Sequence, residues 1–243
     1  MAHSPVMGKG KHIDLAPGRR RTLAYLGAGG FALLTGDYSR AAERASALAC
    51  VARPRQTEGP FFVDEKLNRA DIRSDPLTKA VSEGTPLQVV FRVSQTSGDT
   101  ACAPLPGAQV DVWQCDANGL YSDVQDFQRS TAGLKFLRGH QITDNHGNAS
   151  FLTIFPGWYP GRAVHIHFKV RARGGREFTS QIYFDDALTD AIHAQPPYLT
   201  RGQRRVRNSR DAGALAGGGA LILPLREEKN GYLGIFDMTL AMA

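Results

Sequence analysis

The chain has 243 residues and a net charge of +6, which allows one large domain with or without a tail. Much of the positive charge lies near the start of the chain and in segment 201–210. That segment lacks the interleaved aromatic side chains of a single-strand-binding surface, so we expect no nucleic-acid partner. None of the three cysteines forms a C-x-x-C motif, which argues against a zinc ribbon or a thiol redox site.

Residues 1–50 are typical of a signal-like leader and linker. Arg19, Arg20 and Arg21 precede the apolar run 23–34, which is too short to span a membrane but suits a signal-peptide core. Paired arginines before such a run resemble a twin-arginine export signal. We therefore expect export to the periplasm or cell envelope, with membrane contact only through this leader if it is uncleaved or lipidated at Cys50. A cytoplasmic protein with a basic leader is the alternative.

Residues 51–243 form the predicted catalytic domain, which we expect to be all-β. Short apolar or alternating runs separated by turn residues predict its strands. No long helical period follows the leader, so the pattern favours an antiparallel β-sandwich whose loops carry the chemistry. The runs are 86–93, 108–115, 149–155, 164–170, 178–184, 220–225 and 232–240.

The cysteines leave two interpretations open. If Cys50 is removed with the leader or lipidated, Cys102 and Cys115 are free to form a disulfide in an oxidising compartment. Otherwise both are unpaired thiols, with Cys115 packed beside the strand that leads to Tyr121.

The run Val164–Phe168 carries the clearest chemical signal. His165 and His167 alternate with apolar residues, so on a strand they share one face and reach one metal ion. The loop 156–161 just before them contains Tyr159, whose phenolate would be a hard oxygen ligand suited to Fe(III). A cupin also begins its metal motif with His-x-His, but it needs a glutamate soon afterwards, and the next one here is Glu177.

Four blocks in this order resemble the intradiol ring-cleavage dioxygenases, the family of catechol and protocatechuate dioxygenases. The resemblance implies a β-sandwich and a non-haem Fe(III) ion. It also implies a catecholic substrate that O2 cleaves to a cis,cis-muconate-type dicarboxylic acid in aromatic compound catabolism. The blocks are TEGPFFVDEKLNRADIRSD at 57–75, PLPGAQVDVWQCDANGLYSD at 104–123, TDNHGNASFLTIFPGWYPGRAVHIHFKV at 143–170 and FTSQIYFDD at 178–186.

The same resemblance assigns roles to individual residues. The implied metal ligands are Tyr121, Tyr159, His165 and His167. Arg162 and Gln181 match the family's catalytic arginine and glutamine. The resemblance also implies that one tyrosinate leaves the metal and can accept a substrate proton, and we expect this to be Tyr159 because it lies in a Gly/Pro-flanked loop rather than a strand. Trp158 is expected to line the ring pocket.

Several expectations are less sharply defined. Segment 58–62 either folds over the site or ties the chain start to the sandwich, and His140, His146 and His193 are expected at the surface. Segment 201–210 is expected to be a solvated loop, with attraction of anionic aromatic acids as the second possibility. The sequence leaves open whether the protein forms a homo-oligomer. The competing functions are a β-sandwich binding module without turnover and a cupin-type metal oxygenase.

Overall fold

The computed structural model describes residues 50–97, 101–125 and 130–242. The predicted leader therefore lies outside the described residues, apart from Cys50. No helix within these ranges is long and apolar enough to cross a membrane.

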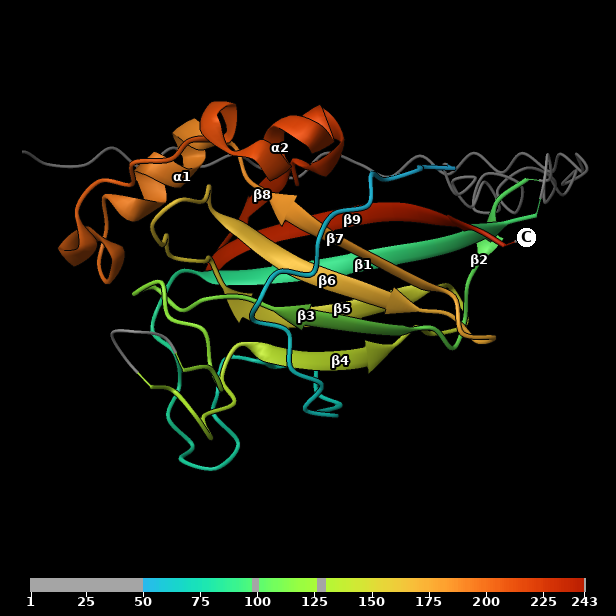
Figure 1. Cartoon of the computed structure of the whole chain (residues 1–243), viewed down its shortest axis with the longest axis horizontal. Helices are drawn as coiled ribbons and strands as arrows, with labels where there is room; N and C mark the ends of the chain where they lie inside the picture. The colour runs from blue at the N-terminus through green and yellow to red at the C-terminus, as the bar shows by residue number, and fades with distance from the viewer. Residues whose placement is uncertain (1–49, 98–100, 126–129, 243) are drawn as a thin grey trace, which may run out of the picture. The chain divides into compact units, whose positions relative to one another are not determined.

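Two β-sheets form the body of the protein (Figure 1). In the first sheet the order is β2-β1-β9-β8, with β5 also paired to β1, and in the second it is β4-β3-β6-β7. The first sheet contains β1 (Pro86–Thr96), β2 (Ala103–Pro104), β5 (Asn148–Ile154), β8 (Leu225–Glu228) and β9 (Gly231–Ala241). The second contains β3 (Gln109–Trp113), β4 (Arg138–Ile142), β6 (His165–Arg171) and β7 (Glu177–Tyr183).

The all-β prediction is confirmed, with three departures in detail. β1 and β9 pair in parallel, with Leu87 opposite Tyr232, whereas the sequence predicted antiparallel pairing throughout. The predicted strand 220–225 is also wrong, because 218–221 form a 3-10 helix and β8 begins only at Leu225. The edge strand β4 was missed, since its sequence RGHQI has no apolar alternation.

Phenylalanines from both sheets interlock in the core. The ring centroid of Phe168 on β6 lies 5.2 Å from that of Phe91 on β1 and 5.3 Å from that of Phe236 on β9. Phe151 on β5 packs edge-on against Phe91 at 6.0 Å. All four side chains are fully buried, and each such burial stabilises the fold by about 2 kcal/mol. This packing holds the two sheets face to face.

Short helices follow β7 and were not predicted. Asp185 caps the α-helix that begins at Asp186 by accepting a hydrogen bond from the Leu188 amide at 2.8 Å. Asp211 caps the α-helix that begins at Ala212 by accepting one from the Ala214 amide at 2.9 Å. The helices are α1 (Asp186–His193), η1 (Tyr198–Arg201), η2 (Asn208–Arg210), α2 (Ala212–Gly217) and η3 (Gly218–Leu221).

A disulfide joins Cys50 to Cys102, with 5.6 Å between the Cα atoms. The predicted Cys102–Cys115 disulfide is therefore wrong, and so is an unpaired Cys102, whereas Cys115 is free and buried as the second interpretation expects. Cys50 reaches Cys102 because its neighbour Val51 pairs with Thr239 on β9, and the Thr239 amide donates to the Val51 carbonyl at 2.8 Å. This contact carries Cys50 to the end of the first sheet, where Cys102 also lies.

Candidate active site

β6 brings two histidines to the face of the second sheet that points away from the core. His165 and His167 alternate along β6 with the core residues Ile166 and Phe168. The sequence predicted a half-buried strand, but both histidines are also buried, with 2% and 1% of their surface exposed. A second layer therefore covers this face.

The Nε2 atom of His165 lies among three other polar side-chain atoms. It is 3.0 Å from Nε2 of His167. It is 3.4 Å from Oη of Tyr121 and 3.3 Å from Oη of Tyr159. The four predicted ligands thus converge on one point, although Tyr121 and Tyr159 come from separate loops.

Both imidazoles are neutral, as a metal requires, and a hydrogen bond fixes the orientation of one of them. The Nδ1–H of His165 donates to the Ala163 carbonyl at 2.7 Å, which leaves Nε2 as an unprotonated lone pair. Burial, and then the Arg162 charge, lower the pKa of His165 to about 4. Burial and the adjacent His165 also hold the pKa of His167 well below its usual range. Both rings are therefore neutral at neutral pH.

The two phenols need a cation to ionise. Burial raises the pKa of Tyr121 well above its ordinary value, and the adjacent Tyr159 adds to the rise. Burial raises the pKa of Tyr159 to about 12, against the lowering effect of the Arg162 charge. A bound metal ion reverses this balance, because it stabilises the phenolate directly.

These residues fit a ferric ion by their donor chemistry. In the described part of the chain no three His, Cys, Asp or Glu side chains gather into a metal-binding cluster. A metal at this point would therefore use the two imidazole nitrogens together with the two phenol oxygens. That mixture of borderline nitrogen and hard oxygen donors suits iron better than zinc or copper.

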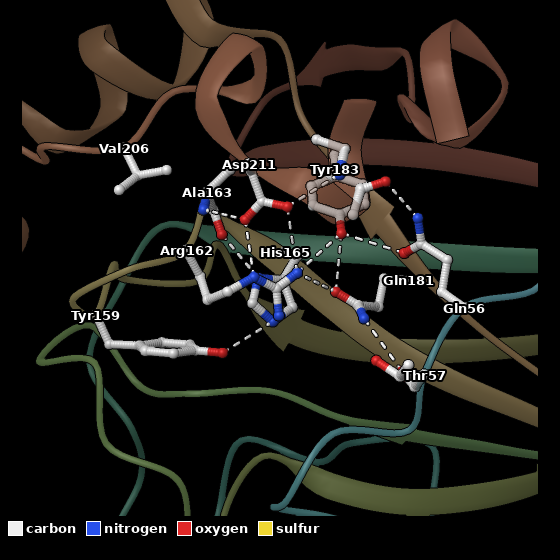
Figure 2. A network of polar contacts seen from close by, with 12 residues as sticks. Gln56, Thr57, Tyr159, Arg162, Ala163, His165, Gln181, Tyr183, Val206 and Asp211 are labelled. Atoms are coloured by element: carbon white, nitrogen blue, oxygen red, sulfur yellow. Dashed lines mark hydrogen bonds and ion pairs between the residues drawn. The ribbon is translucent and has the colours of Figure 1, made fainter. Parts of the chain in front are cut away.

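Arg162 lies next to this cluster and is fixed by a buried carboxylate (Figure 2). Its Nε donates to Asp211 Oδ2 at 2.8 Å, and its Nη2 donates to Gln181 Oε1 at 2.7 Å. Burial alone would lower the pKa of Arg162, but the hydrogen bond to Asp211 and the adjacent Tyr183 outweigh it. Arg162 is thus a permanent cation with a fixed orientation.

Three residues of this network escaped the sequence analysis. Tyr183 Oη accepts from Arg162 at 3.0 Å and lies 2.9 Å from Gln181 Oε1 and 3.1 Å from Gln56 Oε1. Tyr183 could have been found, because it is two residues after Gln181 on β7 and so shares its face. Asp211 and Gln56 carry no local signal, since both reach the site from distant parts of the chain.

Segment 56–62 is the second layer over the ligands. In Figure 1 the blue-to-cyan chain runs across β7, β6 and β3. The Phe61 ring stacks on Tyr121 with centroids 4.4 Å apart, and the Phe62 ring packs on Trp113 at 4.8 Å. Trp113 in turn stacks on His167 at 5.0 Å. Of the two expectations for this segment, folding over the site is the one that these contacts support.

Trp158 lies beside Tyr159 in the loop 156–161. It is half-buried, its Nε1 donates to the Gly202 carbonyl at 3.3 Å, and the Arg201 guanidinium carbon lies 4.8 Å from its ring centroid. Together with Tyr159 it lines a cavity of about 520 Å³.

One surface expectation is wrong and a second holds only in part. His193 is buried, because the end of α1 packs its ring against Tyr198 at 4.9 Å and its Nε2 donates to the Pro156 carbonyl at 2.9 Å. Most of segment 201–210 is exposed, as expected of a solvated loop, but one of its arginines is not. Its Arg204 is buried and forms ion pairs with Asp186 and Asp190.

Comparison with known proteins decides the family. The family model described as Dioxygenase matches residues 57–208, more than half of the chain. The protocatechuate 3,4-dioxygenase beta chain of Burkholderia cepacia is 32% identical over 171 residues, which cover 65% of this chain and 72% of that protein. The chain belongs to the intradiol dioxygenase family. The predicted family is thereby confirmed.

Other members show how far the similarity extends. The intradiol ring-cleavage dioxygenase from Tetranychus urticae is 32% identical with a TM-score of 0.70, covering 78% of this chain and 94% of that one. The catechol 1,2-dioxygenase of Candida albicans is 35% identical over 122 residues, which are 42% of this chain. The chain spans 39% of the length of that family member and 58% of the chlorocatechol 1,2-dioxygenase of Pseudomonas putida.

Proposed function

We propose that this protein is a non-haem Fe(III)-dependent intradiol dioxygenase. It cleaves catechol or a substituted catechol with O2 to a cis,cis-muconate-type dicarboxylic acid, in the catabolism of aromatic compounds. The observation that carries the proposal is the convergence of Tyr121, Tyr159, His165 and His167 within 3.4 Å of one nitrogen, with Arg162 beside them.

The four convergent side chains would hold the metal. Bound Fe(III) would supply a Lewis acid and a template that keeps the catechol ring within reach of O2. The neutral imidazoles of His165 and His167 are fixed by the strand, so they would set the position of the metal. Tyr121 is held by the stacked Phe61 ring and would stay in place.

Tyr159 is the side chain free to take a proton from the substrate. It lies in the loop 156–161, between Gly157 and Pro160, and it is only half-buried. A phenolate on such a loop can move away from the other donors at small cost, and its Oη is then a base for a catechol hydroxyl. We therefore assign Tyr159 the proton-accepting role and Tyr121 the structural one.

Arg162 would stabilise charge on the substrate ring. A guanidinium is always ionised and can lie flat against a conjugated system. Asp211 and Gln181 orient it before the substrate arrives, so no reorganisation is needed as charge develops. The layer formed by segment 56–62 excludes water from this side, which strengthens the interaction.

The visible spectrum and the product test this proposal together. The purified, iron-loaded protein is expected to show a broad tyrosinate-to-Fe(III) absorption band that shifts to longer wavelength on anaerobic addition of catechol. Admission of O2 should then yield a muconate-type product carrying both oxygen atoms. Tyr121→Phe should lose much of the band, whereas Tyr232→Phe, at a distant tyrosine on β9, should keep it.

The alternatives give different results in the same experiment. A cupin-type Fe(II) or manganese oxygenase would be nearly colourless. A binding module would at most change its spectrum with catechol and would form no product. A colourless protein after Fe(III) loading would overturn the assignment of Tyr121 and Tyr159.

We also propose that the protein is exported by the twin-arginine-like leader. The Cys50–Cys102 disulfide supports this, because disulfides persist in oxidising compartments. Fractionation of cells that express the full chain tests it: the mature protein should appear outside the cytoplasm, and Arg19→Lys with Arg20→Lys should retain it inside. Equal distribution of both proteins would contradict export by this signal.

A further inference from the structure

A cavity of about 520 Å³ opens directly beside Tyr159. Its walls are Trp158, Tyr159, Pro160, Gly161, Arg205 and Val206. In Figure 2, Val206 and Tyr159 lie on one side of His165, while Gln56 and Thr57 lie on the other. A ring bound at the four convergent donors would therefore have this cavity on its Tyr159 side.

Arg205 is the charged group of this cavity. It is exposed and has no ion-pair partner among the described residues, and no carboxylate belongs to the cavity wall. Its neighbours in sequence are already neutralised, since Arg204 pairs with Asp186 at 2.6 Å and Arg207 pairs with Asp190 at 2.6 Å. Of segment 201–210, Arg205 is thus the side chain that brings an uncompensated positive charge to this cavity.

The rest of the wall is mainly apolar, and two of its side chains are held by contacts outside the cavity. The Trp158 ring is held by Arg201, whose Nη2 donates to the Trp158 carbonyl at 3.0 Å. Val206 packs against the main hydrophobic core. A mainly apolar cavity with one cationic side chain in its wall is the usual form of a binding site for a small molecule that has an apolar body and a charged end.

The size of the cavity is informative as well. Volumes of this order bury ligands much larger than a bare catechol ring. The ring itself would lie at the convergent donors, and His165, His167 and Tyr121 are not part of the cavity wall. The cavity is therefore available for a ring substituent rather than for the ring.

We infer that the preferred substrate is a catechol bearing a short carboxylate-terminated side chain, and that Arg205 binds that carboxylate. The inference rests on the proposed function and names the substrate class of the same site. Arg205 is a specificity-determining residue: it binds the substituent and does not touch the reacting carbons.

The test compares one acidic and one neutral substrate. The first is a catechol with a propanoate side chain, and the second is its methyl amide, which has the same shape without the charge. In Arg205→Gln, KM for the acid is expected to rise about five- to tenfold with little change in kcat, whereas KM for the amide should change less than about twofold. Arg205→Lys should retain most of the preference, because it keeps the charge.

Arg210→Gln is the matched control, since Arg210 is exposed in the same segment and lies outside the cavity wall. It removes one charge and should leave the ratio of the two KM values unchanged. The inference is wrong if Arg205→Gln changes KM equally for both substrates or for neither. It is also wrong if Arg210→Gln lowers the preference for the acid over the amide as much as Arg205→Gln does.

A binding measurement separates this inference from the proposed function. Calorimetric titration with phenylpropanoate, which has no hydroxyl groups to oxidise, should give weaker binding to Arg205→Gln than to the wild type and to Arg210→Gln. If the wild type cleaves neither catechol, the proposed function fails, and this titration still decides whether Arg205 binds carboxylates. Equal binding to all three proteins would overturn the inference.

Discussion

At the scale of single residues, the orientation of Arg162 depends on Asp211. This carboxylate is 1% exposed, accepts from Arg162 at 2.8 Å and also accepts from the Ala163 amide at 2.8 Å. The Ala163 carbonyl in turn fixes the His165 ring. One carboxylate therefore supports both the cation and the first histidine of the site.

Asp211→Asn should lower kcat about tenfold with a smaller effect on KM, because an amide keeps the shape but loses the charge that orients Arg162. We expect stability to fall by about 2 kcal/mol. Steady-state kinetics and thermal unfolding measure the two effects. Asp185→Asn is the control: Asp185 caps α1 as Asp211 caps α2 but does not contact Arg162. An equal loss of kcat in both variants would contradict the positioning role.

His193 is a buried base that packs against Phe155 and Tyr198. Burial lowers its pKa, and its hydrogen bond to the Pro156 carbonyl only partly opposes this. The unfolded chain therefore binds a proton at His193 at a higher pH than the folded protein does. The free energy of unfolding must then fall as pH decreases below about 6.5, the pKa of an unfolded histidine.

In His193→Gln this part of the pH dependence should disappear. As the pH falls from about 6.5 towards the lowered pKa of His193, the free energy of unfolding of the wild type should fall by up to about 1.4 kcal/mol per pH unit more than that of the variant. Urea unfolding at several pH values measures the difference. The exposed His146→Gln should keep the wild-type slope, and identical slopes for wild type and His193→Gln would show that His193 does not carry the effect.

At the scale of elements, β6 and segment 56–62 form the site together. The strand fixes the spacing of the two histidines, and the segment covers them from outside. Gly59 of this segment lies against the His167 ring: it has φ +73°, and a Cβ there would lie 3.2 Å from Cε1 of His167. Glycine is needed here both for the backbone conformation and for the space.

Gly59→Ala should therefore strain the backbone and press on the His167 ring. We expect a loss of about 1 kcal/mol in stability and about a tenfold loss in iron affinity. Iron content after equilibration with a competing chelator measures the second effect. Gly133→Ala is the matched control, because Gly133 has φ +83° with nothing near its Cβ position. If both variants hold iron equally well, the contact with His167 is unimportant.

At the scale of the whole molecule, local patterns predicted much of the site and distant contacts did not. Alternation along 164–168 predicts that His165 and His167 share a face, because it depends only on the strand period. Asp211 is 49 residues from Arg162, so no local period relates them. The parallel pairing of β1 with β9 likewise joins strands far apart in the sequence. Such contacts depend on how the whole chain folds.

The Cys50–Cys102 disulfide is another long-range contact, and it anchors the segment that ends over the active site. The bond closes a loop of 52 residues, for which chain-entropy arguments give about 4 kcal/mol of stabilisation. From Cys50 the chain is further tied down by the Val51–Thr239 hydrogen bonds and by Arg53, whose guanidinium lies over Phe236 at 4.3 Å. Loss of the bond should therefore leave the covering segment partly held.

Cys102→Ser is thus expected to lower the free energy of unfolding by up to about 4 kcal/mol, while kcat at low temperature falls less than twofold. Urea unfolding with and without a reductant measures the first effect, and the reductant should destabilise the wild type but not the variant. Cys115→Ser is the control for thiol removal, since Cys115 is unpaired. If the reductant still destabilises Cys102→Ser, the stabilisation does not come from this disulfide. If kcat collapses at a temperature where the variant stays folded, the remaining contacts of segment 51–56 do not hold the cover in place.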